Sequence, residues 1–116
     1  MMKVIVAGTR TFENYSLLER KLNKILQNYG TVEIVSGGAK GADSLGEKYA
    51  DLRGHKIAKF LPNWGLWGKQ AGIRRNVYMA QYATHLIAFW DGRSRGTAHM
   101  IKAAKAKGLP VRVIRY

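Results

Sequence analysis

The residues Ser36–Asp43, with sequence SGGAKGAD, are the part of the chain best suited to hold an anion. They follow the apolar run 32–35, which is typical of a buried strand, and lead into residues 42–53, whose apolar positions recur at helical spacing. Glycine lets the backbone adopt positive φ and approach a ligand closely. The first N–H groups of a helix lack partners within it, so a strand, glycine turn and helix start together favour a phosphate. A helix start that binds nothing is the alternative, since one short motif is weakly specific.

Two further segments place glycine, hydroxyl and cationic residues after expected strands. Gly8-Thr9-Arg10 follows the apolar run 2–7, and residues 91–97, with sequence DGRSRGT, follow the apolar run 85–90. The carboxyl ends of parallel strands lie at one edge of a sheet, so these segments and the glycine turn should converge there. Two helix N-termini beside arginines suit a ligand with one or more phosphates. The alternative is coincidence, because loops are commonly rich in glycine and polar residues.

The charged residues of this edge each allow two interpretations. Arg10 either binds a phosphate bidentately through its guanidinium group or forms an ion pair with Glu13 on the surface. Asp43 either stabilises the start of its helix or binds a ribose hydroxyl, and Asp91 caps, coordinates or accepts from a ribose. Among Arg74, Arg75 and Asn76, which lie on the helix expected after residue 69, one side chain could reach the rim.

The tryptophans Trp64 and Trp67 also have two readings. They either stack on a nucleic-acid base or cover the core or a subunit interface. In the helix that follows, Tyr78, Met79 and Tyr82 are expected to face the core.

The elements that must position these residues alternate along the chain. Strands are predicted at 2–7, 32–35, 56–61, 85–90 and 111–114, and helices at 15–29, 42–53, 69–83 and 96–107, with a loop at 63–68. The first helix is expected to start with a capping box at Ser16 and Glu19 and to bury Tyr29. The prediction is an α/β fold: a single Rossmann-like, three-layer domain over residues 1–116, with a mainly parallel five-stranded sheet and helices on both faces.

The composition limits the class of protein. Lys and Arg number 20 against 7 Asp and Glu, a net charge of +13 that attracts anionic ligands and polyanions. There is no cysteine, and the three histidines lack metal-ligand spacing, so no disulfide or metal site is expected. The apolar runs are too short for a membrane span, and we expect a cytoplasmic protein without membrane partners. No Ser-His-Asp set or carboxylate pair emerges, so a catalytic residue cannot be assigned.

Four motifs, taken together, resemble the SLOG superfamily of Rossmann-like domains, in its YspA-like, cpYpsA-related branch. They are Gly8-Thr9-Arg10, SGGAKGAD at 36–43, AGIRRN at 71–76 and DGRSRGT at 91–97, in family order over almost the whole chain. The resemblance implies a pocket for nucleotides or nucleotide-derived molecules. It places Gly37, Gly38 and Gly41 at a phosphate.

Two better-understood branches of the superfamily suggest different activities. The DprA branch shares the glycine pattern and the Arg-Asn pair and binds single-stranded DNA, although the domains that accompany its core are absent here. The LOG phosphoribohydrolases carry an acid three residues after their Gly-Thr. Met100 stands at that position, which argues against hydrolysis.

The sequence therefore predicts a nucleotide-type ligand, with no required cofactor, at the carboxyl edge of the sheet. A single-stranded nucleic-acid-binding module is the main alternative and a nucleotide hydrolase the lesser one; assembly into homo-oligomers stays open. The predicted ligand-binding residues are Gly8, Thr9, Arg10, Ser36, Gly37, Gly38, Gly41, Asp43, Arg75, Asn76, Asp91, Ser94, Gly96 and Thr97.

Overall fold

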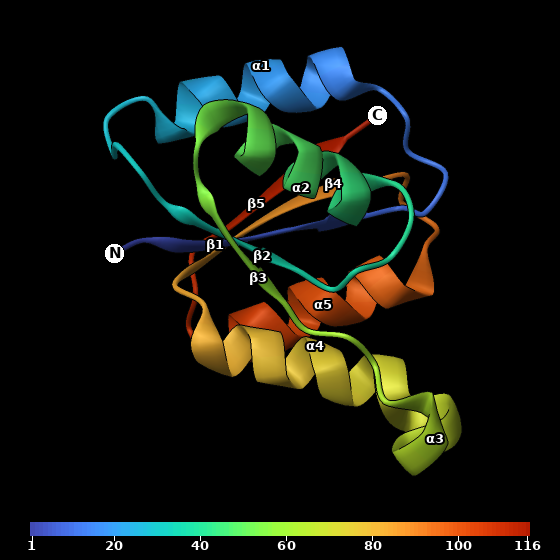
Figure 1. Cartoon of the computed structure of the whole chain (residues 1–116). Coiled ribbons are helices and arrows are strands. Elements are labelled where there is room, and N and C mark those ends of the chain that lie inside the picture. The colour runs from blue at the N-terminus through green and yellow to red at the C-terminus, as the bar shows by residue number, and fades with distance from the viewer.

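Five parallel strands form the central sheet of the computed structural model, which describes all residues 1–116 (Figure 1). The strands are β1 (Lys3–Gly8), β2 (Glu33–Ser36), β3 (Lys56–Lys59), β4 (His85–Trp90) and β5 (Val111–Arg115). Their order is β3-β2-β1-β4-β5, and every neighbouring pair is parallel. The chain reverses its direction of winding between β1 and β4. In open α/β sheets this switch point is where a crevice opens at the carboxyl ends of the strands.

Helices cover both faces of the sheet, as the alternating sequence pattern predicts. Figure 1 shows α1 (Tyr15–Leu26) and α2 (Ala42–Arg53) on one face and α4 (Ala71–Tyr82) and α5 (Arg95–Ala106) on the other. The central strands β1 and β4 each bury four consecutive residues, because side chains of both faces meet a helix layer. The predicted three-layer Rossmann-like fold is confirmed, with a sheet that is wholly rather than mainly parallel. No helix is long and apolar enough to cross a bilayer.

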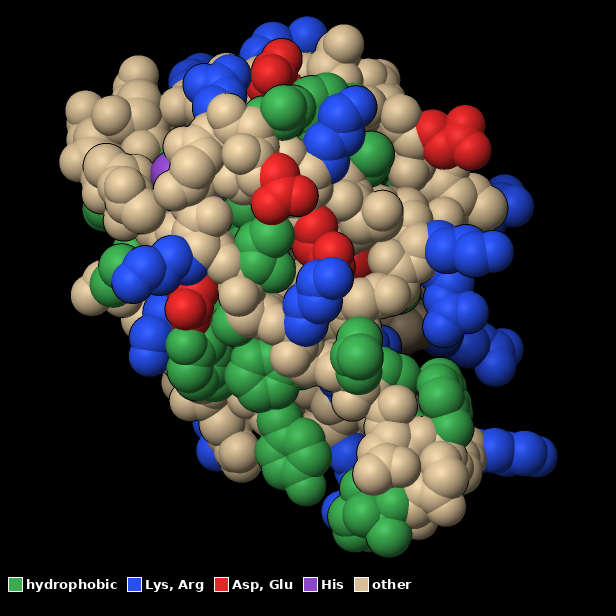
Figure 2. All heavy atoms as spheres, in the orientation of Figure 1, with side chains coloured by type: hydrophobic (Ala, Val, Ile, Leu, Met, Phe, Trp, Pro, Cys, Tyr) green, Lys and Arg blue, Asp and Glu red, His purple; other side chains and the backbone are tan.

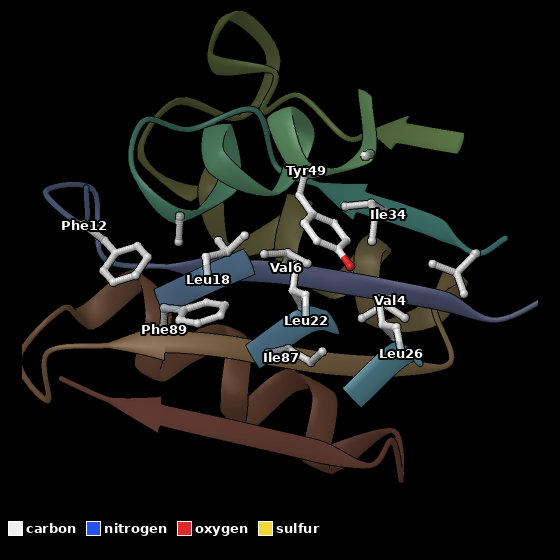
Figure 3. Close-up of a cluster of buried hydrophobic side chains, with 13 residues drawn as sticks. Val4, Val6, Phe12, Leu18, Leu22, Leu26, Ile34, Tyr49, Ile87 and Phe89 are labelled. Carbon is white, nitrogen blue, oxygen red and sulfur yellow. The ribbon is translucent and has the colours of Figure 1, made fainter. Parts of the chain in front are cut away.

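Two apolar clusters hold the layers together. Figure 3 shows the first, in which Leu18 and Leu22 of α1 lie over Val6, Ile87 and other side chains of the sheet. The second cluster lies on the opposite face, between the sheet and the helices α4 and α5. Burying one such aliphatic side chain stabilises the fold by about 1.5–3 kcal/mol, so these clusters fix the strand ends that carry the site.

The structure confirms the expected start of α1 at residue 15 and corrects its end and its N-cap. The helix ends at Leu26 rather than residue 29, and Tyr29 is exposed rather than buried. Its N-cap is Asn14, whose Oδ1 accepts from the N–H of Leu17 at 3.0 Å, so the capping box at Ser16 and Glu19 is wrong. Asn14, two residues before Ser16, has a side-chain oxygen that caps a helix as well as a serine hydroxyl does.

The segment 63–70 is more ordered than a loop. Asn63 caps the short helix α3 (Trp64–Trp67), which continues into the 3₁₀ turn η1 (Gly68–Gln70) before α4. Figure 1 shows α3 standing out from the end of the helix layer. Of the three α4 residues expected to face the core, Met79 is buried, whereas Tyr78 and Tyr82 are exposed.

Candidate functional site: a cationic cleft at the carboxyl edge of the sheet

A cleft of about 290 Å³ opens at the carboxyl edge of the sheet, on its α4–α5 side. Its floor comes from Ala7 and Gly8 at the end of β1, and its walls come from α3, α4 and the start of α5. Eight of the fourteen predicted residues line it: Gly8, Arg10, Asp43, Arg75, Asn76, Ser94, Gly96 and Thr97. The other six lie nearby without lining it: Thr9, Ser36, Gly37, Gly38, Gly41 and Asp91.

Two N–H groups of the glycine turn after β2 donate to side chains of the same segment. The N–H of Gly37 donates to Oδ2 of Asp43 at 3.0 Å, and the N–H of Gly38 donates to Oγ of Ser36, also at 3.0 Å. The Ser36 hydroxyl in turn donates to Glu47 at 2.6 Å. Two of the three glycines expected at a phosphate, Gly37 and Gly38, therefore have their N–H groups satisfied within the protein. The Asp43 carboxylate stabilises the turn itself, a contact that neither interpretation of its sequence position includes.

Arg75 closes this turn from the opposite helix layer. Its Nη1 donates to the carbonyl oxygen of Gly37 at 2.5 Å, and a Cβ on Gly37 would lie 2.6 Å from the same nitrogen. Burial raises the pKa of Asp43 to about 6, against the opposing effects of Arg75 and of the Gly37 and Ala39 N–H groups. Burial likewise lowers the pKa of the Arg75 guanidinium, which Asp43 raises and Arg10 lowers. Arg75 thus ties the glycine turn to the cleft wall.

Thr9 and Gly41 join three loops behind the cleft. Oγ1 of buried Thr9 accepts from the N–H of Asp91 at 3.1 Å, and its carbonyl accepts from the N–H of Phe12 and, at 3.4 Å, of Ala42. Gly41 has φ +80°, and a Cβ there would lie 2.3 Å from the Thr9 carbonyl oxygen. Only glycine fits at this crossing, so these residues hold the loops in place.

The loop after β4 leaves the start of α5 open. Oδ1 of Asp91 accepts from the N–H groups of Arg93 and Ser94 at 2.8 and 2.9 Å, and these bonds lower the pKa of the carboxyl. Ser94 caps α5 by accepting from the N–H of Thr97 at 3.4 Å. The N–H groups of Arg95 and Gly96 have no acceptor within the protein, and a Cβ on Gly96 would meet nothing within 4 Å. Arg95 and Gly96 both line the cleft, so the open donors of this helix start lie at the cleft.

A hydrogen-bond relay runs from Arg75 to His99 along the cleft wall. Nε of Arg75 donates to Oδ1 of Asn76 at 3.0 Å, so the amide presents its nitrogen to Nδ1 of His99, 3.1 Å away. An accepting Nδ1 places the ring proton on Nε2. Burial lowers the pKa of His99, followed by repulsion from Lys102. Sequence reasoning missed His99, because its partner Asn76 lies 23 residues away on another helix.

The cationic rim has no surface ion pair to neutralise it. Arg10 is exposed and forms no ion pair with Glu13; the ion pairs of the molecule are Arg53–Glu19 and Lys59–Glu47. Arg95 and Lys69 also line the cleft, and Asp43 is the one carboxylate among its lining residues. The cleft therefore attracts anions and offers no free carboxylate as a general base.

The two tryptophans have different surroundings. Trp64 is 54% exposed and lines the cleft, so it does not cover the core. Trp67 is half-buried under the guanidinium of Arg74, 3.7 Å above its ring centroid. Sequence reasoning left Trp64 out of the site list because a tryptophan in a loop gives no direction for its side chain.

Comparison with known proteins places this architecture in a family. Residues 2–67 match the model of the YspA, cpYpsA-related SLOG family. The Gene 61 protein of Mycobacterium phage D29 is 33% identical over 119 residues, covering 96% of this chain and 94% of the relative.

Two solved structures share the fold at lower identity. DNA processing protein A (DprA) from Streptococcus pneumoniae superposes with a TM-score of 0.79 at 20% identity, covering 100% of this chain and 51% of DprA. The protein TM1055 superposes with a TM-score of 0.70 at 22% identity, covering 96% of this chain and 72% of TM1055. The chain thus spans about half the length of DprA, and these likenesses establish the fold alone.

Proposed function

This chain belongs to the YspA, cpYpsA-related SLOG family, and we propose that it binds a nucleotide or a nucleotide-derived phosphorylated ligand in the cleft. The observation that carries the proposal is the start of α5, where the N–H groups of Arg95 and Gly96 have no acceptor within the protein. The Arg10 and Arg75 side chains line the same cleft. Open helix donors beside guanidinium groups favour a phosphate over a neutral ligand.

The other lining residues suit the rest of such a ligand. Trp64 offers an exposed ring for a base, and the His99 Nε2–H offers a donor for a hydroxyl or phosphate oxygen. The volume of about 290 Å³ lies at the lower end of the roughly 300–1,000 Å³ typical of small-molecule sites. We place the first phosphate at α5 rather than at the glycine turn. We assign no catalytic residue and propose a cytoplasmic protein.

Native mass spectrometry of freshly purified protein tests the proposal, together with a thermal-shift panel of nucleotides, ADP-ribose and dinucleotides in phosphate-free buffer. A retained nucleotide mass, or a melting temperature that rises with ligand concentration, is the expected result, since a ligand that binds only the native state stabilises it. No bound mass and no shift at millimolar ligand would overturn the proposal.

A second candidate function is the binding of single-stranded nucleic acid. The net charge of +13 favours it, and Figure 2 shows Lys and Arg side chains spread over the visible face with fewer Asp and Glu among them. The likeness to a DNA processing protein adds support at the level of the fold. Fluorescence anisotropy with a labelled oligonucleotide at low and physiological salt tests it, and loss of all binding at physiological salt would contradict it.

A further inference from the structure

The molecule has a second hollow, larger than the cleft and away from it. It has a volume of about 810 Å³ and runs between α1 and the edge strand β5, with Met2, Tyr29 and Pro110 among its lining residues. Its lining comes from α1, β5 and the start of β4, whereas the cleft lies at the carboxyl ends of β1 and β4 on the other face. We name this hollow the α1–β5 groove.

The charged side chains that line the α1–β5 groove are all cationic. Four of its fifteen lining residues are Lys or Arg, and none is Asp or Glu. Residues of a strand alternate between the two faces of a sheet. Ile114 packs with the core on the α1 side, so Arg112 shares that face. Arg115 lies on the other face, with its guanidinium over the Trp90 ring. The cations that face the groove are therefore Lys21, Lys24 and Arg112.

Apolar and aromatic groups accompany these cations. Ile25, Ile87 and Ile114 supply apolar surface among the lining residues. Tyr29, which also lines the groove, is 55% exposed. Tyr116 follows β5 on the α1 side of the sheet and is 49% exposed. Its ring centroid lies 4.7 Å from that of Phe12.

We propose that the α1–β5 groove binds the backbone of a single-stranded nucleic acid, with its phosphates on Lys21, Lys24 and Arg112 and a base stacked on Tyr29. A cationic track with exposed aromatic rings is the arrangement that binds single strands without reading sequence. An acidic peptide would satisfy the cations and leave the tyrosine without a stacking partner. The inference rests on the second candidate function and assigns it a location separate from the nucleotide cleft.

The test compares two triple variants of the full chain that lose the same charge. The groove variant carries Lys21→Gln, Lys24→Gln and Arg112→Gln. The control carries Lys56→Gln, Lys102→Gln and Lys105→Gln, which change exposed lysines of β3 and α5 outside the groove. The probe is a fluorescein-labelled 20-nucleotide oligo-dT, with affinity measured by anisotropy from 50 to 300 mM KCl.

The groove variant should bind at least tenfold more weakly than the control at 150 mM KCl. The slope of log K against log salt should fall by about 2 in magnitude, since each phosphate contact on a single strand contributes about 0.7. Tyr29→Ala should weaken binding by about tenfold, which is within the range for one stacked base. Polyglutamate of matched charge should compete poorly.

The inference would be overturned if the natural chain did not bind oligo-dT at 50 mM KCl, or if both triple variants weakened binding equally. Competition by polyglutamate as strong as by unlabelled oligo-dT would also overturn it. The cleft variants Arg10→Ala and Trp64→Ala are measured alongside, and a loss of binding in these two variants alone would be the fourth contrary result. The last result would place the strand in the cleft. The nucleotide thermal shift is measured on the same variants and reports the cleft separately. A retained shift in the groove variant shows that the two sites fail independently.

Discussion

The loops after β2 and β4 both join a strand to a helix through glycines, yet the N–H groups of Gly37 and Gly38 have acceptors within the protein and the N–H group of Gly96 has none. After β2, Ser36 and Asp43 accept from the N–H groups of Gly37 and Gly38, and Arg75 covers the turn. After β4, the Asp91 carboxylate accepts from two loop N–H groups and α5 still starts with open donors. A glycine-rich turn is thus an anion site only where its N–H groups have no partner inside the protein.

Gly96 also differs in its packing from the glycines of the β2 turn, and from Gly92 of its own loop, where a Cβ would lie 2.2 Å from the Arg115 guanidinium. Substitution of Gly37, Gly38 or Gly41 would place a Cβ less than 3 Å from another atom, whereas Gly96 faces open space. The β2 turn is therefore tightly packed, and the start of α5 is a surface that can receive a ligand. The predictions below challenge this division in order of expected effect.

Gly41→Ala should have the largest effect, because it strains both the backbone and the packing. With φ +80° and a Cβ 2.3 Å from the Thr9 carbonyl, it should lower the free energy of unfolding by about 3 kcal/mol or more. A loss of that size lowers the melting temperature by about 10 °C or more. Gly54→Ala is the control, since Gly54 has φ +73° with nothing within 4 Å and should cost about 1 kcal/mol. Equal losses, measured by calorimetry, would show that the β2 turn is not tightly packed.

Asp43→Asn should change how stability depends on pH. The folded-state pKa of about 6 lies above the usual 3.8, so the folded protein binds the extra proton. The stability from this group is full below about pH 4 and is lost as pH rises through 6. The difference in unfolding free energy, natural chain minus variant, should therefore fall by about 2.4 kcal/mol from pH 4 to 7.5. Urea denaturation at both pH values measures it. A difference that does not change with pH would mean that Asp43 titrates normally and does not bury its charge against the turn.

Arg10→Ala should affect the ligand and not the fold. Arg10 lines the cleft and forms no ion pair, so its loss should weaken nucleotide binding by roughly 1.5–3 kcal/mol, the range for a charged hydrogen bond. Arg10→Lys should recover part of this, because an ammonium lacks the bidentate fork. Arg93→Ala is the matched control, an exposed arginine of the same rim that does not line the cleft. A lower melting temperature with unchanged affinity, measured by calorimetry, would make Arg10 structural.

The fold was predictable because its signals are local. Short apolar runs such as 85–90 read as buried strands, and Gly54 ends α2 in the left-handed conformation expected of a C-cap. The sequence also predicts which loops converge, because parallel strands share a carboxyl edge. The loop expected at 63–68 failed because Asn63 was not weighed as a cap for so short a helix.

The site was less predictable because its details depend on contacts between distant residues. Nothing in the spacing shows that Asp43 turns back to Gly37, or that Arg75, 38 residues further along the chain, reaches the same turn. The sequence also gives no sign that Asn76 pairs with His99, because this contact depends on how α4 and α5 pack against each other. Sequence patterns predict which loops form such a site. Whether a given loop can bind an anion depends on whether its N–H groups already have partners within the protein.

Gly96→Ala is the smallest change and separates the two loops most sharply. Gly96 lies in the first turn of α5 without positive φ, and its Cβ would meet nothing. Alanine should therefore raise the free energy of unfolding of the unliganded protein by about 0.5 kcal/mol, since it restricts the unfolded chain. The same methyl group would enter the cleft that Gly96 lines and should weaken nucleotide binding. A variant that is more stable alone yet gains less melting temperature from ligand is the expected outcome in a thermal-shift titration. If affinity is unchanged, the ligand does not approach α5 and the first phosphate lies elsewhere in the cleft.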